Sequence, residues 1–270
     1  MLELKPPLVL LSGPAGFGEY LKLMDHRYVG GVLLKTVTLH PKEGNPTPRM
    51  ADSDFYVINR IGLENPGIHA FVENVPELPV PMIASLGGDS FEEYLEVARV
   101  FKKVADRFHA VEFNFSCPNV KEGGLSIVKN AEEWKKLLNT LREELPDSFL
   151  IAKVGVEGIF VEDAAEFVMK AEWNGITLVN TVRGLHFERD TMILGGLSGP
   201  VLKPIALRAV YEVKKRFPEL FVIASGGVYS VKDAEEFLKV GADVIGVGSA
   251  LFKDPGVVEE IGKYLLEVKR

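Results

Sequence analysis

The chain has 270 residues, of which 47% are hydrophobic and 26% are charged, and its formal net charge is -7. A chain this long and this apolar can bury most of its surface, which excludes a disordered protein. Its single cysteine excludes an intramolecular disulfide and cannot supply the several thiolates of a structural zinc site or an iron–sulfur cluster. The acidic balance argues against a nucleic-acid partner, and no run of about 18 apolar residues predicts a membrane span. We therefore expect a soluble, cytoplasmic protein that acts on small molecules.

Short apolar runs recur along the chain between stretches long enough for helices. They lack clean alternation, which is typical of parallel strands that helices cover. The eight candidate strands are residues 8–12, 31–35, 81–85, 110–114, 149–153, 176–180, 221–225 and 244–247. Eight strands alternating with helices in fewer than 300 residues fit a (β/α)8 TIM barrel better than a doubly wound open sheet. We predict one α/β domain over residues 1–270, built as this parallel barrel.

Two of the intervening helices carry clear signals at their ends. In residues 90–107, Ser90 and Glu93 form a candidate capping box. A second helix begins at Ser230 with Asp233 in its first turn, and Gly241 ends it in the manner of a C-terminal glycine. The apolar residues that mark the expected buried face of the first helix are Phe91, Leu95, Ala98, Phe101 and Val104.

A long insertion follows the second strand. Residues 40–65 contain several prolines and no strand that the sequence predicts. Loops of this length without secondary structure are usually functional. We expect an irregular wall over the mouth of the barrel.

Polar residues or glycines stand at the carboxyl end of every predicted strand. Ordinary turn chemistry explains any one of them. Their recurrence at all eight ends predicts an active site there, because (β/α)8 barrels place their catalytic groups at that face. These residues are Ser12, Gly13, Lys35, Ser85, Asn114, Lys153, Asn180, Thr181, Gly226, Gly227, Gly248 and Ser249.

The last two strands lead into glycine-rich turns at residues 224–228 and 247–251. Glycines let backbone N–H groups approach an anion, and the loops after strands seven and eight commonly bind phosphate in barrels. The turns thus predict a phosphorylated ligand or cofactor. By themselves they fit flavin enzymes, phosphosugar isomerases or simple tight turns.

The single cysteine, Cys117, lies in the loop after the fourth strand, between the amides of Asn114 and Asn119. A lone cysteine is most often a small buried hydrophobe. In this loop, however, the two amides are suited to binding a planar ligand while the thiolate moves a proton. The residues alone leave both interpretations open.

The same segment carries a family resemblance. Residues 114–124, which read NFSCPNVKEGG, resemble the signature of the class 1 dihydroorotate dehydrogenases, and the tail after Cys-Pro-Asn is similar to that of the NAD-linked subclass 1B. Further blocks resemble the family in the same order along most of the chain. They are residues 35–49, 59–67, 179–185 and 195–207.

The resemblance implies a flavin-dependent oxidation of dihydroorotate to orotate in pyrimidine biosynthesis, with FMN as the hydride acceptor and Cys117 as the base. It assigns substrate binding to Lys35, Asn59, Gly62, Leu63, Asn114, Asn119, Asn180 and Thr181. It assigns cofactor binding to Ser12, Gly13, Lys35, Thr36, Asn114, Lys153, Asn180, Ser198, Gly199, Gly226, Gly227, Gly248 and Ser249. Lys153 would stabilise the negative charge that reduction places on the flavin.

Subclass 1B also implies a partner. Its members work with a second subunit that carries FAD and a [2Fe-2S] cluster and passes electrons to NAD+, in a heterotetramer built on a homodimer. The alternative is the fumarate-linked subclass 1A, which usually has Val-Pro-Gly after Cys-Pro-Asn, whereas this chain departs from that pattern at residues 120–123. Less favoured are a tRNA dihydrouridine synthase, which would carry a basic surface, and a phosphosugar isomerase or non-catalytic binding module.

Several other residues carry no expected role in the chemistry. The five histidines are scattered without metal-ligand spacing, so no metal is expected. The segment 186–195 is shorter than its counterpart in most relatives. We expect solvated or structural roles for Glu112, His186 and Lys203, packing against the barrel for Trp134 and Trp173, and a turn or cap role for Asn65.

Overall fold

The computed structural model describes residues 2–116 and 125–268, and its centre is a closed barrel of eight parallel strands. The strand order around the barrel is β1-β12-β11-β8-β7-β6-β5-β2. Each of the eight predicted runs overlaps one of these strands, so the barrel prediction is confirmed. The barrel strands are β1 (Leu8–Leu10), β2 (Gly31–Leu33), β5 (Met82–Leu86), β6 (Ala110–Asn114), β7 (Leu150–Val154), β8 (Gly175–Leu178), β11 (Phe221–Ala224) and β12 (Val244–Val247).

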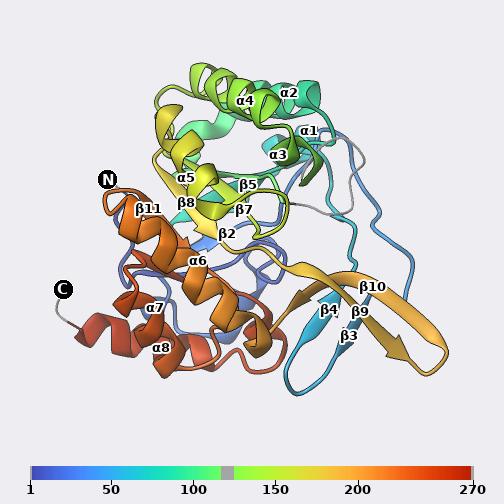
Figure 1. Cartoon of the computed structure of the whole chain (residues 1–270), viewed down its shortest axis with the longest axis vertical. Helices are drawn as coiled ribbons and strands as arrows, with labels where there is room; N and C mark the ends of the chain where they lie inside the picture. The colour runs from blue at the N-terminus through green and yellow to red at the C-terminus, as the bar shows by residue number, and fades with distance from the viewer. Residues whose placement is uncertain (1, 117–124, 269–270) are drawn as a thin grey trace.

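Helices surround the barrel (Figure 1). The α-helices are α1 (Ile68–Glu73), α2 (Phe91–Phe101), α3 (Leu125–Lys129), α4 (Ala131–Glu144), α5 (Val161–Lys170), α6 (Lys203–Arg216), α7 (Val231–Lys239) and α8 (Val257–Glu267). Short 3-10 helices are η1 (Glu19–Leu23), η2 (His26–Tyr28), η3 (Lys102–Arg107), η4 (Pro200–Leu202) and η5 (Ser249–Phe252). Among the described residues, no helix combines the length and the apolar content needed to cross a bilayer.

The two predicted helix starts are confirmed, with one refinement. The Ser90 hydroxyl accepts the N–H of Glu93, and that of Ser230 accepts the N–H of Asp233, each at 3.2 Å. The return bond of each box reaches one residue further back than expected. The Glu93 carboxylate accepts the N–H of Asp89 at 2.9 Å, and Asp233 accepts that of Tyr229 at 3.0 Å. Both helices therefore begin where the sequence indicates.

The buried face of α2 is rotated in part from the predicted one. Ala98 and Phe101 are fully buried as predicted, but Tyr94 and Val97 are buried in place of Phe91 and Leu95, which are only partly buried. The rotation is stabilised by Tyr94, whose hydroxyl donates to the carbonyl of Asn114 at 2.7 Å and so gives a buried aromatic ring a partner for its polar tip. The α-helix ends at Phe101 and continues as the 3-10 helix η3, so the helical run reaches residue 107 as expected and only its last six residues change type.

Strand alternation separates two apolar layers. One cluster joins helix residues to strand residues such as Leu8 and Val111, so these strand residues face the helices. The other cluster joins inward-facing positions of the strands to Leu2 and Leu4 of the N-terminal segment and lies inside the barrel. Its members are Leu2, Leu4, Val9, Leu11, Leu33, Ile83, Ala110, Ile151, Ile223 and Val244. The interior is therefore filled with side chains, as expected of a barrel of this size.

A second, antiparallel sheet stands apart from the barrel, and the sequence analysis did not predict it (Figure 1). Its order is β3-β4-β10-β9, formed by β3 (Met50–Asp52), β4 (Val57–Asn59), β9 (Val182–Glu188) and β10 (Thr191–Ser198). The insertion 40–65 is thus irregular only outside β3 and β4, and the short segment 186–195 spans a hairpin. Ala51, Ile58 and Ile193 form the small core of this sheet. The three-residue strands β3 and β4 are too short for a periodic signal, and the pairing of β4 with β10 joins segments far apart in the chain.

Candidate active site

A cavity of about 380 Å³ opens at the carboxyl ends of the barrel strands. It is lined by nearly all of the predicted site residues that the structure describes. These are Ser12, Gly13, Lys35, Thr36, Asn59, Gly62, Leu63, Asn114, Lys153, Asn180, Thr181, Ser198, Gly226, Gly227, Gly248 and Ser249. Cys117 and Asn119 lie outside the described residues.

The glycine turn after β11 is held tightly against the chain near α6. Gly226 has φ +114° and Gly227 has φ +82°, a region that favours glycine. A Cβ at Gly227 would lie 2.7 Å from the Cβ of Lys203, and one at Gly226 would lie 2.9 Å from that of Ala206. Within the described part of the chain, the N–H groups of Gly226 and Gly227 donate to no acceptor. These free donors suit an anionic group.

The two glycine-rich turns meet at the same end of the cavity. The Tyr229 hydroxyl donates to the Oγ of Ser249 at 2.9 Å, which joins the turn after β11 to the start of η5. Both residues line the cavity. The predicted phosphate region is therefore one continuous surface, although the sequence analysis did not single out Tyr229.

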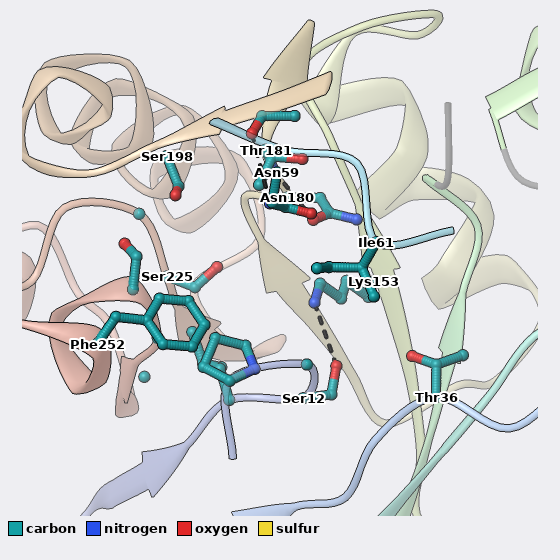
Figure 2. Close-up of a pocket in the computed structure, with 18 of the residues that line it drawn as sticks. Ser12, Thr36, Asn59, Ile61, Lys153, Asn180, Thr181, Ser198, Ser225 and Phe252 are labelled. Atoms are coloured by element: carbon teal, nitrogen blue, oxygen red, sulfur yellow. Dashed lines mark hydrogen bonds between the residues drawn. The ribbon is translucent and has the colours of Figure 1, made fainter. Parts of the chain in front are cut away.

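Lys153 presents a buried ammonium group to the floor of the cavity. It lies at the end of β7 and only 6% of it is exposed. Its Nζ donates to the Oγ of Ser12 at 3.4 Å, the only hydrogen bond of this amine among the described residues (Figure 2). An ammonium has three donors, so further donors remain for a ligand. A ligand with a negative or electron-rich edge fits this position.

An amide cluster lies on the side of the cavity next to β6 and β8. Asn180 donates to the Oγ of Ser116 at 2.7 Å and to Oδ1 of Asn114 at 3.4 Å. Ser116 in turn donates to Oδ1 of Asn114 at 3.1 Å. The Asn59 amide donates to the carbonyl of Gly196 at 3.4 Å, and Figure 2 shows Asn59 beside Asn180. Ser116, which no sequence signal singled out, fixes the orientation of both asparagines.

The loop that follows β4 is shaped by Asn65, for which the sequence predicts a turn or cap role. Its Oδ1 accepts the N–H groups of Thr38 and Gly67 at 3.1 and 2.9 Å, and its amide donates to the carbonyl of Leu63 at 2.6 Å. Leu63 has φ +53° and Gly62 has φ +81°. A non-glycine residue at positive φ stores strain, which persists only where surrounding contacts enforce it. Asn65 provides such contacts and holds Gly62 and Leu63 at the cavity.

Other side chains that the sequence analysis did not single out also line the cavity: Arg49, Met50, Ile61, Glu64, Tyr229 and Phe252. Arg49 and Glu64 form an ion pair of 2.9 Å. Arg49 lies within a block that carries the family resemblance, which was the available signal for it. Phe252 belongs to η5 and had no sequence signal beyond its place after a glycine turn.

The structure does not place Gly199 in the cavity lining. A Cβ there would lie 2.7 Å from the Cα of Tyr56, and its φ is +104°. Gly199 is therefore needed for the close approach between the end of β10 and the neighbouring hairpin. Its predicted contact with the cofactor has no support from this geometry.

The residues given no catalytic role have defined partners. Lys203 forms ion pairs with Asp233 and Glu236 at 2.6 and 2.9 Å, which raise its pKa. The Tyr56 hydroxyl lies 3.0 Å from Nδ1 of His186. Glu112 is not solvated, because it is fully buried inside the barrel.

Trp134 on α4 and Trp173 directly after α5 are buried in the layer between barrel and helices, as predicted. Among the described residues, no group of three or more His, Cys, Asp or Glu side chains is placed to hold a metal ion.

The closed parallel barrel, with a polar cavity at the carboxyl ends of its strands, defines the class of (β/α)8-barrel enzymes. The chain belongs to the dihydroorotate dehydrogenase family, whose sequence model matches residues 1–268. It is 97% identical over all 270 residues to the protein of Thermotoga maritima named dihydroorotate dehydrogenase B (NAD(+)), catalytic subunit, and covers 100% of both chains. The protein of the same name from Anoxybacillus flavithermus is 39% identical, over 96% of this chain and 86% of the relative.

The fold is also similar to a solved structure. A dihydroorotate dehydrogenase from Eimeria tenella, crystallised in complex with ferulenol, superposes with a TM-score of 0.80 at 20% identity. The match covers 96% of this chain and 80% of that one. At this level of identity the similarity concerns the fold.

Proposed function

We propose that this chain is the catalytic subunit of an NAD-linked dihydroorotate dehydrogenase, which oxidises dihydroorotate to orotate in pyrimidine biosynthesis. The observation that carries the proposal is the single cavity that joins free glycine N–H donors, the buried Lys153 ammonium and the asparagine cluster. The relatives described above are named as NAD(+)-linked catalytic subunits, which favours this subclass over the fumarate-linked one.

FMN is the proposed cofactor, and the residues present fit it. Gly226 and Gly227 offer two N–H groups for its phosphate that have no acceptor among residues 2–116 and 125–268, at a turn where a Cβ would clash. Lys153 offers an ammonium with unused donors for the electron-rich edge of the ring, while Lys35 and Thr36 line the same floor. The flavin, when bound, supplies the hydride acceptor for carbon C6 of dihydroorotate.

The substrate is proposed to lie against the amide cluster. Amides provide both donors and acceptors, which the alternating N–H and C=O groups of the pyrimidine ring require. Asn180 and Asn114 are already oriented by Ser116, so little side-chain freedom is lost when the ring binds. The loop at Gly62 and Leu63 is proposed to receive the carboxylate of the substrate.

Cys117 is the proposed base that removes the proton from carbon C5. It lies outside the described residues, but it follows directly on Ser116, whose hydroxyl belongs to the amide cluster. A free thiol is partly ionised near neutral pH and suits proton removal better than an unassisted hydroxyl. Asn119 is proposed to bind the ring from the same loop.

The proposal includes a partner. An electron-transfer subunit carrying FAD and a [2Fe-2S] cluster would receive the electrons and pass them to NAD+, in a heterotetramer built on a homodimer. The printed name of the relatives, catalytic subunit, supports a separate partner. A protein surface is further supported by exposed apolar side chains paired across β9 and β10, where Phe187 faces Met192 and Leu185 faces Leu194. The cytoplasmic location stays a prediction, which cell fractionation tests.

The deciding experiment is anaerobic reduction of the purified chain by dihydroorotate, followed through its flavin absorbance. We expect a yellow protein that dihydroorotate bleaches and that fumarate does not reoxidise efficiently. Robust turnover with fumarate would favour the fumarate-linked subclass 1A. A colourless protein that takes up no FMN would instead refute the flavin assignment and favour a phosphosugar isomerase or a non-catalytic binding module. Salt-sensitive binding of tRNA would favour a tRNA dihydrouridine synthase.

A further inference from the structure

Glu112 is a fully buried carboxyl group that the proposed function does not use. It lies on β6 with its side chain inside the barrel, where apolar side chains usually fill the space. A buried charge is costly unless it is compensated. Its retention in the barrel interior therefore calls for a physical explanation.

The surroundings of Glu112 are arranged for an acceptor. The Thr177 hydroxyl donates to Oε2 at 2.7 Å, and the Ser85 hydroxyl donates to Oε1 at 3.4 Å. The hydroxyl of Thr36, which lines the cavity, lies 2.8 Å from that of Ser85. Each carboxyl oxygen thus has one hydroxyl donor within reach, which suits an ionised carboxylate because that form only accepts.

The compensating charge is that of Lys153. The inner faces of three adjacent strands carry Glu112 on β6, Lys153 on β7 and Thr177 on β8, and Lys153 is directly opposite Thr177 in the register. Burial is the largest influence on Glu112 and raises its pKa, while the charge of Lys153 and the two hydroxyl donors counteract part of this rise. Among the described residues, the Lys153 amine donates only to Ser12, so its charge acts on Glu112 without a direct hydrogen bond.

We propose that Glu112 is a positioning residue that sets the positive potential at the floor of the cavity, by holding a negative charge beneath Lys153. The carboxylate partly cancels the positive electrostatic potential that the Lys153 ammonium produces at a bound ligand. Anions therefore bind less tightly at this position than they would beside the lysine alone. Opposite charges in a buried site interact far more strongly than in water. The inference rests on the proposed function only in that bound flavin serves as the reporter.

The first test compares flavin-loaded wild type with Glu112→Gln, which keeps the shape and removes the charge. Sulfite adds to oxidised flavin and leaves a negative charge on the ring, so its dissociation constant reports the local potential. We expect sulfite to bind at least tenfold more tightly to Glu112→Gln, with a higher two-electron potential of about 30 mV per tenfold change. Glu112→Asp, which restores the charge, should return the dissociation constant to within about threefold of the wild-type value.

The matched control is Ile151→Val. Ile151 pairs with Glu112 in the β6–β7 register and belongs to the apolar interior. Its truncation lowers barrel stability without changing any charge, so sulfite affinity should stay at the wild-type level. A sulfite dissociation constant in Glu112→Gln within twofold of wild type would overturn the proposal, because Glu112 would then be neutral in the folded protein.

A second test needs no flavin and so distinguishes this inference from the proposed function. A double-mutant cycle of Glu112→Gln and Lys153→Met is measured by denaturant unfolding of the apoprotein. Each variant lowers the folding equilibrium constant by a measured factor. If the charges compensate each other, the factor for the double variant is at least tenfold smaller than the product of the factors for the two single variants. Additive losses would overturn the inference even if the chain binds FMN, whereas a chain that binds no FMN would refute only the proposed function.

Discussion

Replacement of Gly227 by alanine tests the assignment of the phosphate end. Gly227 has φ +82°, and a Cβ there would lie 2.7 Å from the Cβ and 2.8 Å from the backbone nitrogen of Lys203. A left-handed conformation costs a non-glycine residue about 1–2 kcal/mol, and overpacking costs about 1–3 kcal/mol more. Because the obstructing atoms include backbone, the turn must move, and the total cost is about 2–5 kcal/mol.

The same movement should weaken flavin binding. The free N–H groups of Gly226 and Gly227 would no longer both face the phosphate, and one hydrogen bond to a charged group contributes about 1.5–3 kcal/mol. Loss of one such bond corresponds to a roughly tenfold to hundredfold weaker dissociation constant. The assay is titration of the apoprotein with FMN, followed through quenching of flavin fluorescence.

Gly241→Ala is the matched control for this prediction. Gly241 also has positive φ, +101°, but it lies at the end of α7, where a Cβ would meet only the side chain of Lys214. This variant should lose stability and keep its affinity for FMN. If Gly227→Ala binds FMN as tightly as the wild type while Gly241→Ala shows its expected loss of stability, the turn after β11 does not bind the phosphate.

Three further predictions follow from single residues. Cys117→Ala should abolish the bleaching of bound flavin by dihydroorotate and leave the spectrum of the oxidised flavin intact. Cys117→Ser should slow the reaction and move its optimum to higher pH. Unimpaired bleaching in Cys117→Ala would show that Cys117 is not the base. Asn65→Ala removes the hydrogen bonds that hold Leu63, so we expect about 1–3 kcal/mol weaker orotate binding at unchanged FMN affinity, measured by orotate titration of the loaded protein. Burial raises the pKa of Asp233, but its bonds to Lys203, Tyr229 and Ser230 outweigh this and lower it. The stabilisation from Asp233 is therefore present above the unfolded pKa and lost as pH falls through the folded one. Asp233→Asn should be less stable than wild type in urea at neutral pH and equal to it in acid; a difference that persists in acid would contradict this explanation.

The barrel could be predicted from the sequence because its signals are local. Each barrel strand is a short apolar run, and the helices begin at capping residues such as Ser90 and Ser230 that contact the backbone three residues away. The carboxyl ends of the strands follow from the boundaries of these apolar runs. Residues far apart in sequence, such as Ser12 and Lys153, are therefore expected at one cavity, and both line it.

The antiparallel sheet could not be predicted in the same way. Asn59 on β4 pairs with Gly196 on β10, and the two lie 137 residues apart. The strands β3 and β4 have three residues each, so neither shows enough alternation to be distinguished from a loop. Pairing between distant short strands depends on how the barrel brings their ends together.

By itself, the sequence determined the parallel barrel, the position of its catalytic face and the types of residue gathered there, because hydrophobic burial and turn chemistry act over a few neighbouring residues. Tertiary structure alone decided which of those residues contact one another. Glu112 illustrates the difference, since its neighbours in sequence do not show whether a carboxyl group is solvated. Its burial beside Thr177 and Ser85 arises only when β5, β6 and β8 turn the same face inward, and there the low dielectric makes its interaction with Lys153 strong.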